Sequence, residues 1–222
     1  MRLIDDRKVY NAGTRRTIAS MRNGYQICFC LLMTAVLLGA FPVVVSAEGR
    51  IAERIETYPI NGRTGMELYL SIGERGPKLG NTRAIAHTTF DLKWTRKYER
   101  RGNACVLGVA KPWLTITYTV PKPSENLPKA VKARWERFAA GVLAHEKVHG
   151  ESILQMVRTI EAFSVGFTVD DDPQCKKIRA ELTRRLAEAS ATQRKQGSDF
   201  DREEFRQGGN MHRLILDLVN GD

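Results

Sequence analysis

The chain divides into two parts that differ in the spacing of their apolar residues. Between residues 82 and 98, apolar and polar side chains alternate, so that Ala86, Leu92 and Trp94 share one face. A period of two predicts a half-buried β-strand. Beyond residue 123, apolar residues recur at steps of three and four, which is the spacing of one helix face. We therefore expect a β-rich part followed by an α-rich part.

Shorter segments complete the predicted sheet. Residues 56–60 and 66–72 have strand-like patterns on either side of the turn-rich sequence NGRTG, and residues 106–123 provide one or two further strands. The fold class that follows is α+β. We expect an antiparallel sheet of about four to five strands within residues 48–122, followed by the helical part in residues 123–222.

The helical part predicts two long helices and a short C-terminal one. The second helix should run from about Gln174 to Gln196, with Asp172 as its N-cap and Pro173 in its first turn. The sequence GSD at 197–199 is expected to break or kink it, and a short helix ends the chain. The first helix carries one long apolar stripe, made of Trp135, Phe138, Val142, His145, His149, Ile153, Met156, Ile160 and Phe163.

The N-terminal segment has the composition of an export signal. Residues 1–26 carry six basic and two acidic side chains, and residues 27–47 carry no charge. We expect a signal peptide over residues 1–47 that is cleaved after Ala47, with Met21 as an alternative start. The alternative is an uncleaved membrane anchor, since the apolar run is long enough to span a bilayer. Residues 48–222 would then form one domain in the periplasm or outside the cell, anchored to the inner membrane if residues 27–47 remain.

Charge narrows the classes of partner. The formal net charge is +10, and the leader accounts for part of it, which leaves +6 for residues 48–222. This charge suits a protein near anionic envelope surfaces. Because no dense basic stripe is interleaved with aromatic residues, we expect no nucleic-acid partner. Contact with a membrane is expected only through an uncleaved leader.

Two cysteines remain outside the leader. Cys105 lies in the strand region and Cys175 just before the second long helix. In an oxidising compartment they would most simply form one disulfide, and the alternative is two free buried thiols.

The sequence HEKVH within residues 141–152 carries the candidate chemistry. His145 and His149 are four residues apart, so both imidazoles project from one helix face and can bind one Zn²⁺. Glu146 between them can act as general base toward a water molecule. The competing interpretation is two core histidines satisfied by hydrogen bonds. His87 lies on the polar side of its strand, where a position at the rim of a cleft or in solvent is expected rather than a ligand role.

Several motifs resemble a known family. The segment YPINGRTGMELYLSIGERGP, the strand ending at Trp94, CVLGVAKPWLTITYTVP, HEKVHGE and the cysteine of PQC are similar to bacterial exported proteins grouped as domain of unknown function 922. The family is described as predicted secreted zinc-dependent proteases. The resemblance covers most of residues 48–222 and supports pairing of Cys105 with Cys175.

The C-terminal part departs from that family pattern. Members usually end with Tyr-Asp-x-x-Thr-x-His-Gly, whose histidine is the natural third zinc ligand. Here Phe200 and Asp201 match the opening, but Glu204 stands at the threonine and Arg206 at the histidine. Arginine has no lone pair for a metal. By position on a continuing helix and by ligand chemistry, we rank Glu204 first as third ligand, followed by His212 and Glu203. Asp201 is expected to hold an imidazole from outside the ligand set.

The leading hypothesis from the sequence is an exported zinc-dependent metallopeptidase-like hydrolase acting on a peptide or protein substrate in the cell envelope. One Zn²⁺ would be bound by His145, His149 and Glu204, with Glu146 as general base. Two alternatives remain. One is a non-catalytic envelope module with structural zinc or no zinc, and the other is an anchored partner-binding protein in which the motif is coincidental.

Overall fold

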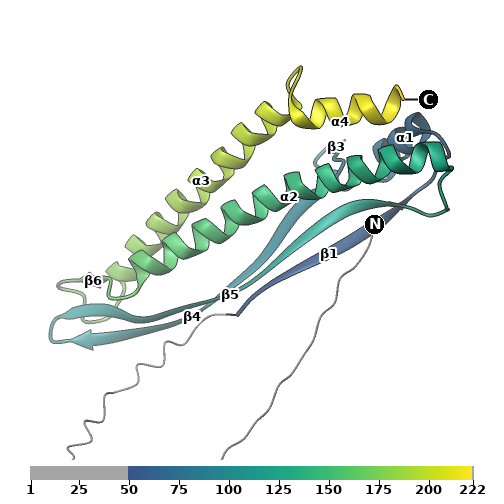
Figure 1. The fold of residues 1–222 in the computed structure, drawn as a ribbon. Coiled ribbons are helices and arrows are strands. Elements are labelled where there is room, and N and C mark those ends of the chain that lie inside the picture. Colours follow the sequence, from purple (N-terminus) through teal and green to yellow (C-terminus); the bar gives the residue numbers. More distant parts are fainter. Residues whose placement is uncertain (1–49, 222) are drawn as a thin grey trace, which may run out of the picture. The chain divides into compact units, whose positions relative to one another are not determined.

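The computed structural model describes residues 50–221, so the expected leader at 1–47 lies outside the described residues. Within the described range, no helix combines the length and the apolar character needed to cross a bilayer. Figure 1 shows a twisted sheet with the helices packed along one of its faces.

Three long strands form the main sheet in the spatial order β1-β5-β4. They are β1 (Arg50–Ile60), β4 (His87–Arg101) and β5 (Ala104–Pro123), and the short β6 (Thr168–Val169) pairs with the start of β5. Antiparallel pairing is correct for β4, β5 and β6, but β1 runs parallel to β5, so the sheet is mixed. The long connection between β1 and β5 allows this, because parallel strands need a crossover.

Residues 66–72 are not a strand. They belong to α1 (Gly65–Arg75), whose N-terminus has a capping box. The Thr64 side chain accepts a hydrogen bond from the Glu67 backbone N–H, and the Glu67 carboxylate accepts one from the Thr64 backbone N–H. This reciprocal pair satisfies two helix-end donors and favours a helix start at this point. A small hairpin of β2 (Lys78–Leu79) and β3 (Thr82–Arg83) follows.

Three further helices make up the second part. They are α2 (Lys129–Ser164), α3 (Lys177–Phe205) and α4 (Asn210–Val219). Figure 1 shows α2 lying along the sheet, with α3 and α4 packed against α2 on the side away from it. The expected break at 197–199 is wrong, because α3 continues through these residues to Phe205.

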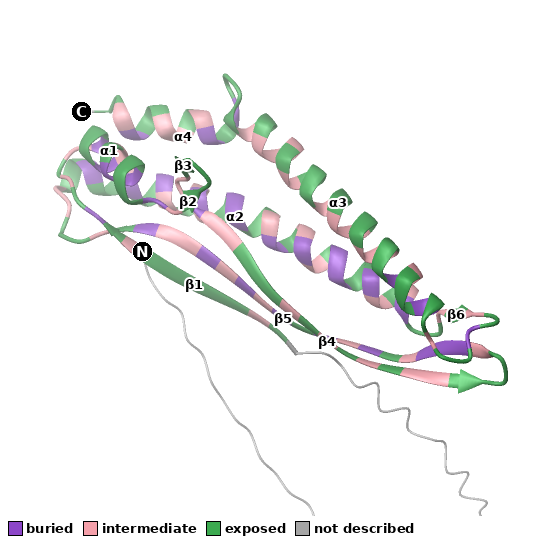
Figure 2. Ribbon diagram, turned by 180° about the vertical axis from the view of Figure 1, so that it is seen from behind, coloured by how far each residue is buried: buried purple, intermediate pink, exposed green. Residues whose placement is uncertain are grey.

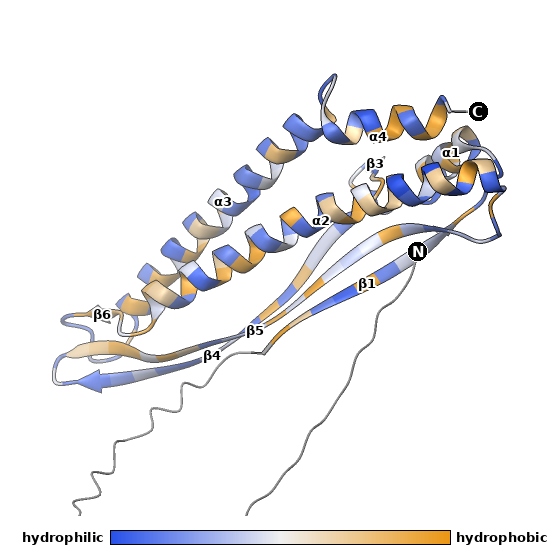
Figure 3. Cartoon of the chain, viewed as in Figure 1, coloured by the Kyte–Doolittle hydropathy of each residue, from blue (hydrophilic) through white to orange (hydrophobic). Residues whose placement is uncertain are grey.

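The core lies between β5 and α2. Alternate residues of β5 from Ala110 to Tyr118 are buried, and they face the buried stripe of α2 (Figure 2). Figure 3 shows the contrast with α3, which is mostly hydrophilic. One apolar cluster contains Val142 of α2 and another contains Ile153. His145 and His149 occupy the two helical turns between these clusters.

The disulfide between Cys105 and Cys175 is confirmed. It joins the start of β5 to the segment before α3. Asp172 is not the predicted N-cap, because α3 begins at Lys177 with Lys176 as its N-cap. The Asp172 carboxylate nevertheless accepts hydrogen bonds from the backbone N–H groups of Lys176 at 2.8 Å and Ile178 at 2.9 Å. The start of α3 is therefore fixed by the disulfide and by these hydrogen bonds.

Candidate metal centre

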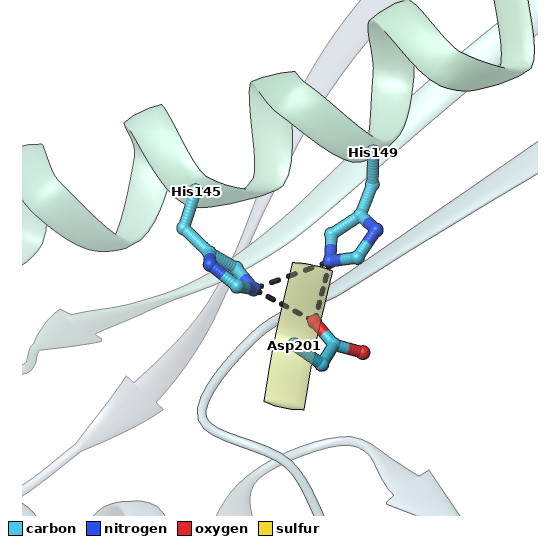
Figure 4. A group of neighbouring side chains, drawn as sticks. All are labelled: His145, His149 and Asp201. Atoms are coloured by element: carbon cyan, nitrogen blue, oxygen red, sulfur yellow. Dashed lines mark hydrogen bonds and ion pairs between the residues drawn. The ribbon is translucent and has the colours of Figure 1, made fainter. Parts of the chain in front are cut away.

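The two motif histidines converge as their spacing predicts. The side chains of His145 and His149 are 5% and 17% exposed, and their Nε2 atoms lie 3.2 Å apart. Both point away from the axis of α2 toward α3 (Figure 4). Their orientation follows from a separation of four residues on an unbroken helix.

Asp201 completes the cluster. Its Oδ1 lies 2.8 Å from Nε2 of His149 and 3.2 Å from Nε2 of His145. Among the described residues, these three side chains form a group able to hold a metal ion, with one ligand atom each and all three atoms within 4.8 Å of one another. Asp201 reaches this position because α3 continues past Gly197, which lies against the His149 ring.

The hydrogen bonds within the cluster shift the pKa values of His149 and Asp201 toward their charged forms. The hydrogen bond that His149 donates to Asp201 raises the pKa of His149, although burial opposes the rise. Burial by itself would raise the pKa of Asp201, but hydrogen bonds from His145 and His149 outweigh it and hold that pKa well below its usual range. An ionised carboxylate therefore faces both Nε2 atoms, which is the protonation state that a metal ligand requires.

Glu204 approaches the other nitrogen of His145. Its Oε2 lies 3.7 Å from Nδ1, and the Asn210 amide donates to the same oxygen at 3.2 Å. Nδ1 of His145 is buried and has no hydrogen-bond partner among residues 50–221. Asp201 therefore faces Nε2 of both histidines, whereas Glu204, ranked first as third ligand, lies near Nδ1 of His145.

The other ranked ligands are directed elsewhere. Glu203 pairs with Arg206 at 2.6 Å, and both side chains are exposed. Nδ1 of His212 accepts a hydrogen bond from the Gly208 backbone N–H at 3.3 Å. His87 lines the neighbouring cavity but is not part of the three-residue cluster.

Aromatic rings surround His145. Phe200 stacks on it with ring centroids 4.8 Å apart, and Phe205 meets it edge-on at 5.5 Å. Phe200 also contacts His149 edge-on, at 5.5 Å. Phe200 therefore faces inward, toward both imidazoles. These ring contacts limit the rotation of both imidazoles.

Glu146 is buried beside the cluster and is held by the sheet. Its Oε2 accepts a hydrogen bond from the Thr88 hydroxyl at 2.5 Å, and its backbone carbonyl lies 3.1 Å from the same hydroxyl. Only 5% of Glu146 is exposed. The hydroxyl fixes the direction of a carboxylate next to the three candidate ligands.

An open cavity of about 750 Å³ adjoins these residues. It lies between the first residues of β4, the β2–β3 hairpin, α3 and α4, and it is lined by His145, Glu146, His149 and Asp201. A cavity of this volume can hold a small molecule or a few residues of a chain next to the cluster.

The donor set fits zinc. Two imidazole nitrogens and a carboxylate oxygen are typical zinc ligands, and bond lengths of about 2.0–2.1 Å in a tetrahedron separate ligand atoms by about 3.3 Å. The observed separations of 2.8 to 3.2 Å are close to that value. Three such ligands would leave the fourth position of a bound zinc ion for water or substrate, which is the pattern of catalytic zinc sites.

Comparison with known proteins identifies the family. Residues 55–209 match the family described as bacterial protein of unknown function (DUF922). No curated protein and no solved structure matches the chain significantly. The match includes the helix with both histidines and extends past Asp201 and Glu204. The chain therefore belongs to the bacterial DUF922 family.

Proposed function

We propose that the protein is an exported zinc-dependent hydrolase of the metallopeptidase type, with His145, His149 and Asp201 as zinc ligands. The observation that carries the proposal is the convergence of these three ligand atoms at the wall of an open cavity. The disulfide supports export, because such bonds persist in oxidising compartments.

In this proposal the residues have separate tasks. A bound zinc ion would supply Lewis acidity and lower the pKa of a water molecule toward about 7. Glu146 takes a proton from the attacking water molecule while the water oxygen bonds to the amide carbon of the substrate. Glu146 then gives that proton to the amide nitrogen as the C–N bond breaks. The products are a carboxylate and an amine. Thr88 keeps the Glu146 carboxylate directed toward the reacting groups.

The free edge of β4 provides a surface for the substrate backbone. Among residues 50–221, β4 pairs with β5 on one side only, and its residues His87, Thr88 and Phe90 line the cavity. Every second residue of an edge strand directs its N–H and C=O outward, so an extended peptide can add to it as a further strand. Such a peptide would pass directly beside the cluster.

The test is hydrolysis of a fluorescently labelled unfolded protein by the zinc-loaded protein and by its Glu146→Gln variant. We expect cleavage by the wild type, and a loss of at least about a hundredfold in the variant with zinc content unchanged. Full turnover by Glu146→Gln would defeat the proposed mechanism. Zinc binding without any cleavage would favour a non-catalytic envelope module.

A further inference from the structure

The cavity has an apolar part that is exposed to solvent. Leu79, Phe90 and Phe205 line it, and each is 42% exposed. They come from the β2–β3 hairpin, β4 and the end of α3, so separate elements present large apolar side chains around one opening. Ile85 and Ile215 continue this lining toward α4. Exposed apolar groups gathered in a concave surface mark a binding site for apolar groups.

Two guanidinium groups lie in the same lining. Arg83 belongs to β3, and Arg194 lies on α3 about two turns before Asp201. Nη1 of Arg83 donates to the Gly76 carbonyl at 2.6 Å, and Nη1 of Arg194 donates to the Ser190 hydroxyl at 2.6 Å. Each guanidinium has five N–H donors, so both keep donors for a ligand.

The charge of these two arginines is not compensated by a carboxylate within the described range. Other basic side chains of α3 have acidic partners: Arg184 pairs with Glu181, and Arg202 with Asp199. Neither Arg83 nor Arg194 forms an ion pair within residues 50–221. The basic residues that face the cavity are thus left available for an anionic group from outside.

The two arginines lie toward opposite ends of the cavity. Arg83 precedes by two residues Ile85, which packs against the apolar cluster that contains Val142 and Met211. Gln193, next to Arg194, donates a hydrogen bond to the hydroxyl of Ser152 on α2, the residue before Ile153. The candidate zinc ligands lie between, because His145 and His149 stand between Val142 and Ile153 on α2.

We propose that the cavity selects extended polypeptide segments with large apolar side chains beside the reacting bond and acidic side chains toward both ends. The apolar side chains would contact Leu79, Phe90 and Phe205, and the acidic ones would pair with Arg83 and Arg194. This inference deepens the proposed function and rests on it for the position of the reacting bond.

The experiment measures binding separately from cleavage. The Glu146→Gln variant, with and without added zinc, is titrated into fluorescent octapeptides that share one frame. Their central pair is Leu-Leu or Ala-Ala, and their flanks carry Asp or Lys. We expect the Leu-Leu peptide with Asp flanks to bind about tenfold more tightly than the peptide with Lys flanks, and more tightly than the Ala-Ala peptide.

Matched variants test the named side chains. In the same background, Arg83→Gln and Arg194→Gln should each reduce the preference for Asp over Lys flanks by about threefold or more. The controls are Lys78→Gln, the register partner of Arg83 on the hairpin, and Lys195→Gln, the residue after Arg194, neither of which lines the cavity. Leu79→Asn should weaken the Leu-Leu peptide selectively, whereas Leu70→Asn on the surface of α1 should not.

Either of two results overturns the inference: equal binding of Asp and Lys flanks, or equal effects of the arginine and lysine substitutions, which would reflect net charge alone. A failure of the proposed hydrolase function would give a different result from a failure of this inference. The Glu146→Gln variant would then bind peptides with the expected preference while the wild type cleaves none of them. Cleavage without that preference would keep the function and remove the inference.

Discussion

Asp201 and Glu204 approach different nitrogens of the same imidazole ring. Asp201 Oδ1 lies 3.2 Å from Nε2 of His145, and Glu204 Oε2 lies 3.7 Å from Nδ1. Three residues apart on α3, they occupy the same helix face, yet only Asp201 also reaches His149. The geometry therefore favours Asp201 as a ligand and Glu204 as the group that orients a ligand.

This division predicts a graded effect on zinc affinity. Glu204→Gln should weaken zinc binding by about tenfold to a hundredfold while one equivalent still binds at saturation, because the carboxylate charge 3.7 Å from Nδ1 of His145 makes the imidazole a better ligand. Competition with a chromophoric chelator measures the affinity. Glu203→Gln, one residue away and directed toward Arg206, is the control and should leave it unchanged. Equal losses in both variants would contradict the assignment.

Thr88 should affect turnover without affecting metal binding. Thr88→Val removes the hydroxyl that donates to Glu146, so the carboxylate loses its fixed direction. We expect kcat to fall by about tenfold to a hundredfold with zinc content unchanged. The control is Thr89→Val, since Thr89 is exposed on the opposite face of β4. A loss of zinc from Thr88→Val would show that this residue supports the metal site itself.

Gly150, the residue after His149, lies where α2 packs closely against β5. A Cβ at this position would overlap the Tyr118 hydroxyl and lie 2.8 Å from its Cζ. Gly150→Ala should lower the free energy of unfolding by about 1–3 kcal/mol. Gly73→Ala, on the open surface of α1, should raise it by about 0.5–1 kcal/mol. Denaturant titration compares the two, and similar effects would refute the close approach.

The lowered pKa of Asp172 predicts that the folded protein loses stability in acid. Burial opposes its ionisation, but hydrogen bonds from the backbone of α3 prevail and lower the pKa of Asp172 in the folded protein. Its stabilising effect is therefore present above the unfolded pKa of about 3.9 and is lost as pH falls through the folded pKa. Asp172→Asn should lower Tm at pH 7 and lessen the decline of Tm below pH 4. Parallel pH profiles of Tm for both proteins would contradict this.

Much of the architecture could be predicted from the pattern of residues. The period of two identified β4, and the stripe from Trp135 to Phe163 identified α2 with both histidines on its buried side. The capping box at Thr64 and Glu67 was a readable signal for α1 that the alternation over 66–72 concealed. The pairing of strands could not be predicted, because alternation shows which face of a strand is buried but not which strand lies next to it. The parallel pairing of β1 with β5 was missed for that reason.

The third candidate ligand was the hardest feature to predict. Which residue of α3 faces the histidines depends on how α3 rotates and crosses α2, and a family pattern with a substituted histidine does not provide that. A signal existed nevertheless. Gln193, Gly197, Asp201 and Glu204 continue at helical spacing the inner stripe that begins at Leu182 and Leu186. An uninterrupted helix would have placed Asp201 beside His149, but Gly197 suggested a break.

The most direct test of the account is the zinc content of the purified protein and of its Asp201→Ala and Glu204→Ala variants. The account predicts about one equivalent in the wild type, none retained by Asp201→Ala, and zinc that is bound more weakly but still stoichiometrically by Glu204→Ala. Zinc content unaffected by Asp201→Ala, or a wild-type protein that binds no zinc, would contradict it.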